Sequence, residues 1–166
     1  IHLSTDYVFD GASNNPYTES DVVNPQSIYG KSKLAGELVI QKYCPKHIIL
    51  RTSWVFSEFG KNFVKTMLNM SSNKEIEVID DLFGTPTEAN ELANAIIKLI
   101  PIVMEPQFES KIVHFAGQES VSWFEFASII FDEAINNNFI EKIPVINPIS
   151  SKLYQAKAAR PNNSSL

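Results

Sequence analysis

The sequence has no pair of cysteines, no long apolar run and no cluster of basic residues, and each of these absences argues against one class of protein. Its only cysteine, Cys44, cannot form an internal disulfide, which favours a reducing compartment and predicts a cytoplasmic protein. No apolar run approaches the roughly 20 residues of a membrane-spanning helix, so no membrane partner is expected. The 14 basic residues are scattered among 19 acidic ones, which argues against a nucleic-acid partner. A small molecule is therefore the expected ligand.

Glycine is also scarce, with six residues in 166. No two of them form a G-x-G or G-x-x-G pair, the pattern that makes a tight turn before a helix and binds the pyrophosphate of a dinucleotide. These 166 residues therefore lack a dinucleotide phosphate loop.

What the sequence does contain is an alternation of short apolar runs with amphipathic stretches, at 44% hydrophobic residues overall. This alternation predicts an α/β fold of one ordinary domain. The tail 143–166 is rich in turn-forming residues and has no clear period. The expected strands are 1–9, 47–56, 76–81 and 111–117, and the expected helices are 27–43, 63–72, 87–100 and 123–135.

Two of the expected helices have apolar residues at helical spacing, which predicts a buried stripe on each. The stripe of 27–43 comprises Ile28, Ala35, Leu38 and Val39. The stripe of 123–135 comprises Phe124, Ala127, Phe131 and Ile135.

The helix 27–43 also places Tyr29 four residues before Lys33. This spacing puts both side chains on one helical face, with Cβ atoms about 6 Å apart. A phenol is a poor proton donor or acceptor at neutral pH, and a neighbouring ammonium brings it toward a useful range by favouring the phenolate. Thr5, at the end of the first strand, is the candidate hydroxyl that completes the site. On its own the pair is a weak signal, because two such residues often share a solvated face.

Five stretches in a fixed order make the signal specific: "STDYVFDG", "YGKSKLAGE", "RTSWVF", "GTPT" with "ELA", and "RPNNS". Together with Thr5, which lies 24 residues before Tyr29, they resemble the dTDP-4-dehydrorhamnose reductases of the extended short-chain dehydrogenase/reductase superfamily. The resemblance covers nearly the whole chain. It implies part of a doubly wound Rossmann-type parallel sheet and a smaller α/β substrate-binding region. The division expected is 1–80 for the former and mainly 81–166 for the latter.

The resemblance also implies a reaction, the reduction by NADPH or NADH of the C4 keto group of a dTDP-sugar, dTDP-4-dehydro-L-rhamnose. In this interpretation Tyr29 protonates the C4 oxygen and Lys33 binds the nicotinamide ribose, so both are catalytic and cofactor-binding residues. Thr5 binds the keto oxygen, and Asp6 and Trp54 match positions that contact the sugar nucleotide. A turn-capping role for Thr5 and plain core packing for Trp54 are the structural alternatives.

Related enzymes are distinguished by the two residues after Thr5. Sugar-nucleotide dehydratases of this superfamily have an Asp-Glu pair there, whereas Asp6 is followed by Tyr7 in this chain, which favours reduction. Epimerase-reductases of the fucose pathway use a Cys/His pair, and Cys44 lies at the far end of the helix from Tyr29. Two alternatives stay open, namely a non-catalytic binding or regulatory subunit and a reductase or epimerase acting on another nucleotide sugar.

The family pattern adds three expectations about the whole protein. The missing phosphate loop predicts a nucleotide-binding segment of about 100 residues upstream of Ile1, without which this segment is inactive. A homodimer is expected, with Mg²⁺ at the dimer contact, although the glutamates that bind it cannot be matched to this sequence. No metal ligand is assigned, since the three histidines have no metal-binding spacing.

Overall fold

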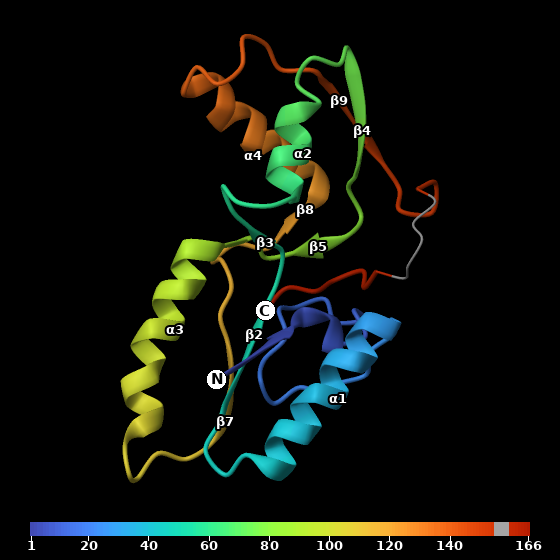
Figure 1. The fold of residues 1–166 in the computed structure, drawn as a ribbon. Coiled ribbons are helices and arrows are strands. Elements are labelled where there is room, and N and C mark those ends of the chain that lie inside the picture. The colour runs from blue at the N-terminus through green and yellow to red at the C-terminus, as the bar shows by residue number, and fades with distance from the viewer. Residues whose placement is uncertain (155–159) are drawn as a thin grey trace.

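A three-stranded parallel sheet lies at the centre of the lower part of the molecule (Figure 1). The computed structural model describes residues 1–154 and 160–166. The sheet has the order β1-β2-β7, with β1 at His2–Thr5, β2 at Ile48–Thr52 and β7 at Lys111–His114. Helices α1 (Ile28–Tyr43) and α3 (Ala89–Met104) lie on its two sides. Parallel strands with a helix on each face confirm the predicted α/β class.

The middle strand β2 begins with three apolar residues, because both of its faces are covered. Ile48, Ile49 and Leu50 are almost completely buried. Ile48 and Leu50 pack with Leu92 of α3. Arg51 points to the other face, toward α1, because successive side chains of a strand alternate between faces.

Helix α1 confirms the predicted span to within one residue, but its predicted buried stripe is wrong. Ser27 caps the helix by accepting a hydrogen bond from the Gly30 backbone N–H at 3.0 Å. The buried residues are Gly30 and Glu37. All four residues of the predicted stripe are exposed, namely Ile28, Ala35, Leu38 and Val39.

The upper part of the molecule has its own apolar core. Its elements are α2 (Phe63–Asn69), β4 (Glu75–Ile79), α4 (Trp123–Asn136) and β9 (Val145–Ile149). Strands β4 and β9 pair in parallel, and α4 packs against α2 and β4. A capping box between Ser122 and Glu125 starts α4. The buried cluster comprises Met67, Ile76, Val78, Phe126, Ala127, Ile130 and Phe131.

In the upper part of the molecule, α4 confirms the predicted helix 123–135, whereas the prediction for the tail is incomplete. Within the predicted stripe of that helix, Ala127 and Phe131 are fully buried, while Phe124 and Ile135 are half-buried. No element was assigned to the tail, which has no clear period, and the structure contains β9 there. Residues 155–159 of the same tail lie outside the described residues.

Short strands connect the two parts. Strand β3 (Val55–Phe56) pairs with β6 (Thr87–Glu88), and β5 (Phe83–Gly84) pairs with β8 (Val121–Ser122). The C-terminal residues return to this junction, where Asn163 bridges to Phe83 and the Ser165 carbonyl accepts from the Tyr17 backbone N–H. Because the chain crosses the junction several times, the division at residue 80 stays a prediction. In the part of the chain that the structure describes, no helix is long and apolar enough to cross a membrane.

Candidate active site

The carboxyl end of β1 places Thr5 and Asp6 at the edge of the sheet where open α/β folds bind ligands. Both residues are buried. The Thr5 hydroxyl donates to Asp6 Oδ1 at 2.7 Å and accepts from the Tyr7 backbone N–H at 3.2 Å, so that it caps the short helix η1 (Asp6–Val8). The capping role considered for Thr5 therefore exists. In this structure the Thr5 hydroxyl donates to Asp6, and a ligand that accepts a hydrogen bond from Thr5 has to displace this bond.

Asp6 is the most perturbed carboxyl group of the site. Its burial raises its pKa to about 6, and the hydrogen bond from Thr5 only partly opposes this shift. Its second oxygen, Oδ2, is buried and has no hydrogen-bond partner within residues 1–154 and 160–166. Asp6 therefore has a free acceptor, or a donor when protonated, at the base of the site.

Helix α1 brings Lys33 to β1 and Tyr29 to the short helix η1 that follows it. The Tyr29 ring is 54% exposed and meets the Tyr7 ring edge to face, with centroids 5.8 Å apart. Lys33 Nζ donates to the Leu3 carbonyl oxygen in β1 at 2.6 Å. Gly30 allows this approach, because a Cβ there would collide with the Tyr7 carbonyl oxygen. The predicted pair is therefore placed beside the strand end that carries Thr5.

Trp54 lies where the predicted strand 47–56 breaks into β2 and β3. Its backbone is in the left-handed region, with φ of 44°, which is uncommon for a bulky residue. Its ring stacks on Trp123 with centroids 3.5 Å apart, and a Cβ on Gly84 would collide with its indole atoms. Trp54 thus contacts the core and Trp123. It is Trp123, not Trp54, that lines a cavity beside Tyr7.

This cavity, of about 520 Å³, opens between η1 and the upper part of the molecule. Tyr7 joins it to the helix that carries Tyr29. Among the described residues, its wall is mainly aromatic and apolar and includes the cation Arg160 and the carboxylate Glu77. A pocket of this size and lining suits a ligand with a planar ring and an anionic group. The lining residues are Tyr7, Phe63, Thr66, Met67, Met70, Glu77, Val78, Ile79, Trp123, Tyr154 and Arg160.

None of these lining residues was assigned a role from the sequence, and the three most relevant to a ligand are Tyr7, Trp123 and Arg160. Tyr7 and Arg160 lie within the quoted stretches "STDYVFDG" and "RPNNS", so a signal was present without an assigned role. Trp123 comes directly after the N-cap of a helix, which gives no hint of a ligand. Burial raises the pKa of the Tyr7 phenol, which keeps it protonated and able to donate.

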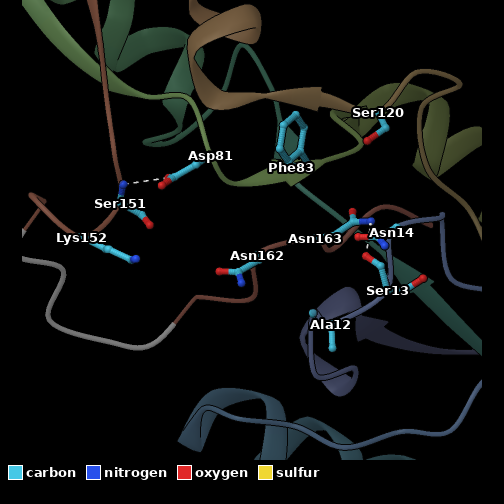
Figure 2. A pocket seen from close by; sticks show the side chains of 11 residues that line it. Ala12, Ser13, Asn14, Asp81, Phe83, Ser120, Ser151, Lys152, Asn162 and Asn163 are labelled. Atoms are coloured by element: carbon cyan, nitrogen blue, oxygen red, sulfur yellow. Dashed lines mark hydrogen bonds between the residues drawn. The ribbon is translucent and has the colours of Figure 1, made fainter.

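A second cavity, also of about 520 Å³, lies between the turn at residues 11–14 and the two short stretches 151–152 and 162–163 (Figure 2). Two of its polar side chains make hydrogen bonds between loops. Asp81 accepts from the Ser151 backbone N–H at 2.7 Å, and Asn163 Nδ2 donates to the Ser13 carbonyl oxygen at 3.0 Å. None of the predicted site residues lines either cavity, but Tyr7 of the first cavity contacts Tyr29, whereas no described residue of the second is linked to the predicted site in this way. We therefore assign Asp81 and Asn163 to holding the loops together.

The expected metal has no site assigned to it. Among the described residues, no three histidine, cysteine, aspartate or glutamate side chains are close enough together to hold an ion. The homodimer and its Mg²⁺ stay predictions.

Known proteins resemble this chain along its whole length. A family model described as the RmlD substrate binding domain matches residues 1–166. The dTDP-4-dehydrorhamnose reductase of Aggregatibacter actinomycetemcomitans is 44% identical over 168 residues, which cover 100% of this chain and 57% of that protein. The enzyme of the same name from Salmonella typhimurium is 38% identical, covering 100% of this chain and 56% of that protein. The chain thus spans about half the length of these curated relatives.

Solved structures give the same result for the fold. The crystal structure of dTDP-4-dehydrorhamnose reductase from Bacillus anthracis in complex with NADP superposes with a TM-score of 0.88 at 38% identity, covering 99% of this chain and 55% of that one. A dTDP-glucose 4,6-dehydratase from Streptomyces venezuelae superposes with a TM-score of 0.69 at 16% identity, covering 90% of this chain and 46% of that one. At that identity the second likeness shows the fold alone.

Proposed function

The chain belongs to the RmlD substrate binding domain family, and from this premise we propose that the complete protein containing it is an NAD(P)H-dependent reductase. Its substrate is dTDP-4-dehydro-L-rhamnose, and its product is dTDP-L-rhamnose. The observation that carries the proposal is the position of Lys33 against β1 and of Tyr29 against Tyr7, which lines the neighbouring cavity. The names of the A. actinomycetemcomitans and S. typhimurium relatives support the choice of reaction.

The residues at the end of β1 fit a nicotinamide cofactor on one side and a ketone on the other. Lys33 Nζ holds three protons and uses one on the Leu3 carbonyl oxygen, so it can also donate to ribose hydroxyls. Tyr29 is half-exposed and its hydroxyl is available to the same ligand. When bound, the reduced cofactor supplies the hydride that adds to C4.

Tyr29 supplies the proton that balances this addition. Its O–H bond breaks as the C4 oxygen becomes a hydroxyl, and the ammonium of Lys33, four residues on, stabilises the phenolate that remains. Thr5 binds the keto oxygen by turning its proton from Asp6 to the ligand. The acidic partner expected for dehydration is absent, because Tyr7 follows Asp6. Reduction is therefore favoured over elimination.

The cavity accounts for the rest of the substrate. Arg160 is the cation that pairs with the diphosphate, and its guanidinium lies 5.8 Å from the centroid of the Tyr154 ring. Trp123 and Phe63 offer ring faces or edges to the thymine base. Trp54 supports Trp123 from behind, so its effect on the substrate is indirect.

The test compares wild type with Tyr29→Phe in the complete protein, following cofactor absorbance with dTDP-4-dehydro-L-rhamnose and with NADPH and NADH in turn. Loss of the phenolic proton should lower kcat by about 10² or more. Tyr43→Phe is the matched control, because Tyr43 ends the same helix, is 68% exposed and undergoes the same chemical change. No turnover by wild type that still binds the cofactor would overturn the proposal in favour of another keto sugar or a binding subunit.

A further inference from the structure

The face that α1 turns to the sheet has few apolar side chains. The apolar residues that were expected to hold it there are exposed. Leu34 is a half-buried member of the cluster around Val8 and Phe9, and the two fully buried positions are Gly30 and Glu37. Apolar packing is non-directional and, on this face, sparse. The rotation of the helix that carries Tyr29 therefore depends on other contacts.

Glu37 and Arg51 provide the directional contact. Arg51 Nε donates to Glu37 Oε1 at 3.0 Å, and Arg51 Nη2 donates to Glu37 Oε2 at 2.8 Å. The Glu37 side chain is 0% exposed and that of Arg51 is 3% exposed, and the guanidinium lies over the Phe9 ring at 5.1 Å. A bidentate pair of this kind fixes distance and orientation together. It joins the middle of the sheet to the middle of α1.

The spacing along α1 connects this pair to the reacting groups. Tyr29, Lys33 and Glu37 are four residues apart in turn, so their side chains follow one face of the helix. Glu37 is thus two turns from the phenol. At the other end, Gly30 rests on the Tyr7 backbone. A helix held at both points cannot rotate or slide without moving the phenol relative to Thr5.

Stability alone does not account for a buried ion pair at this position. Two apolar residues of similar volume usually serve stability as well or better, because both charges lose their hydration. Arg51 also has a buried nitrogen, Nη1, without a hydrogen-bond partner in the described part of the chain. What an apolar pair lacks is a defined direction.

We propose that Glu37 and Arg51 are positioning residues that set the rotation of α1 on the sheet and so place Tyr29 and Lys33 for proton transfer. The inference rests on the proposed reductase function for its kinetic consequence. It has a structural consequence that does not depend on activity, namely the packing of the Tyr29 ring against Tyr7.

The experiment uses Glu37→Gln and Arg51→Lys in the complete protein. The first keeps the shape and removes the charge, and the second keeps the charge and removes the fork. Because a displacement of about 1 Å can cost 10² in rate, we expect kcat to fall roughly 10- to 100-fold while KM for the sugar nucleotide changes less than about threefold. Leu92→Ala, on the opposite face of the sheet, is the control for lost stability. Rates are measured well below every melting temperature.

The second readout is the ring resonance of Tyr29 in protein with ¹³C-labelled tyrosine, assigned by its loss in Tyr29→Phe. It should shift in Glu37→Gln and Arg51→Lys, while the resonance of Tyr43 and both resonances in Leu92→Ala stay in place. Lower melting temperatures with unchanged kcat and an unmoved Tyr29 resonance would reduce the pair to a structural role and overturn the inference. If wild type proves inactive, the reductase proposal fails, and the Tyr29 resonance alone decides for or against positioning.

Discussion

Asp6 should make the stability of this protein depend on pH, because it is a carboxyl group buried at the end of β1 with one oxygen unpartnered among the described residues. The perturbation is Asp6→Asn. The amide has nearly the same shape and keeps an oxygen for the Thr5 hydroxyl, which donates to Oδ1 at 2.7 Å. What disappears is the titration of the group. The variant therefore isolates the cost of ionising this carboxyl inside the fold.

The sign and size of the effect come from the raised pKa. Burial moves the pKa of Asp6 from 3.8 to about 6, so the folded protein binds this proton more tightly than the unfolded chain does. The resulting stabilisation is fully present below the unfolded value and is lost as pH rises through the folded value. A shift of about 2 pKa units corresponds to about 3 kcal/mol in the free energy of unfolding.

The assay is urea unfolding of wild type and Asp6→Asn, without ligands, at steps from about pH 4 to about pH 7. The free energy of unfolding of wild type relative to the variant should fall by roughly 2 kcal/mol across this range, because the unfolded carboxyl is already partly ionised at its lower end. Asp132→Asn, which removes an exposed carboxyl from α4, gives the baseline for losing one surface charge. A wild-type advantage that stays constant with pH would refute the reasoning, because Asp6 would then ionise at no cost.

Two further predictions concern glycines that make room for site residues. Gly30→Ala places a methyl group against the Tyr7 carbonyl oxygen, so kcat should fall at least about 10-fold in the cofactor-absorbance assay. Gly36→Ala is the control on the same helix. The nearest atom to its methyl group would be 3.4 Å away, so kcat should stay unchanged. Gly84→Ala pushes on the Trp54 ring and should lower the free energy of unfolding by about 1–3 kcal/mol and raise KM for the sugar nucleotide, and an unchanged KM would contradict the role given to this stack.

The sequence predicted the local parts of the site well. Short-range periodicity is enough to predict the strand that ends at Thr5 and the helix that carries Tyr29 and Lys33. The structure contains both elements. Their roles in catalysis stay predictions. The span of α1 was also predicted to within one residue, since Ser27, placed inside the helix, is its N-cap. These features require no knowledge of what each element packs against.

The errors come from contacts between distant residues. An apolar stripe shows which face of a helix is apolar, and not which face is covered, so Leu38 and Val39 were placed in a core that Glu37 occupies instead. Glu37 can be buried in the face of α1 only because Arg51 meets it from strand β2. Strand β9 was missed because Pro148 interrupts its pattern, although proline is tolerated in a strand with an open edge.

The stacked rings of Trp54 and Trp123 are an intrinsic spectroscopic probe of this segment. They are the only two tryptophans among the 166 residues, and their rings are nearly parallel at 11°. Two identical chromophores in van der Waals contact couple their electronic transitions, so the segment should give a paired positive and negative band in circular dichroism. Because Trp123 also lines the cavity, a bound base that disturbs the stack would change that spectrum. Ligand binding could then be followed without a label and without turnover.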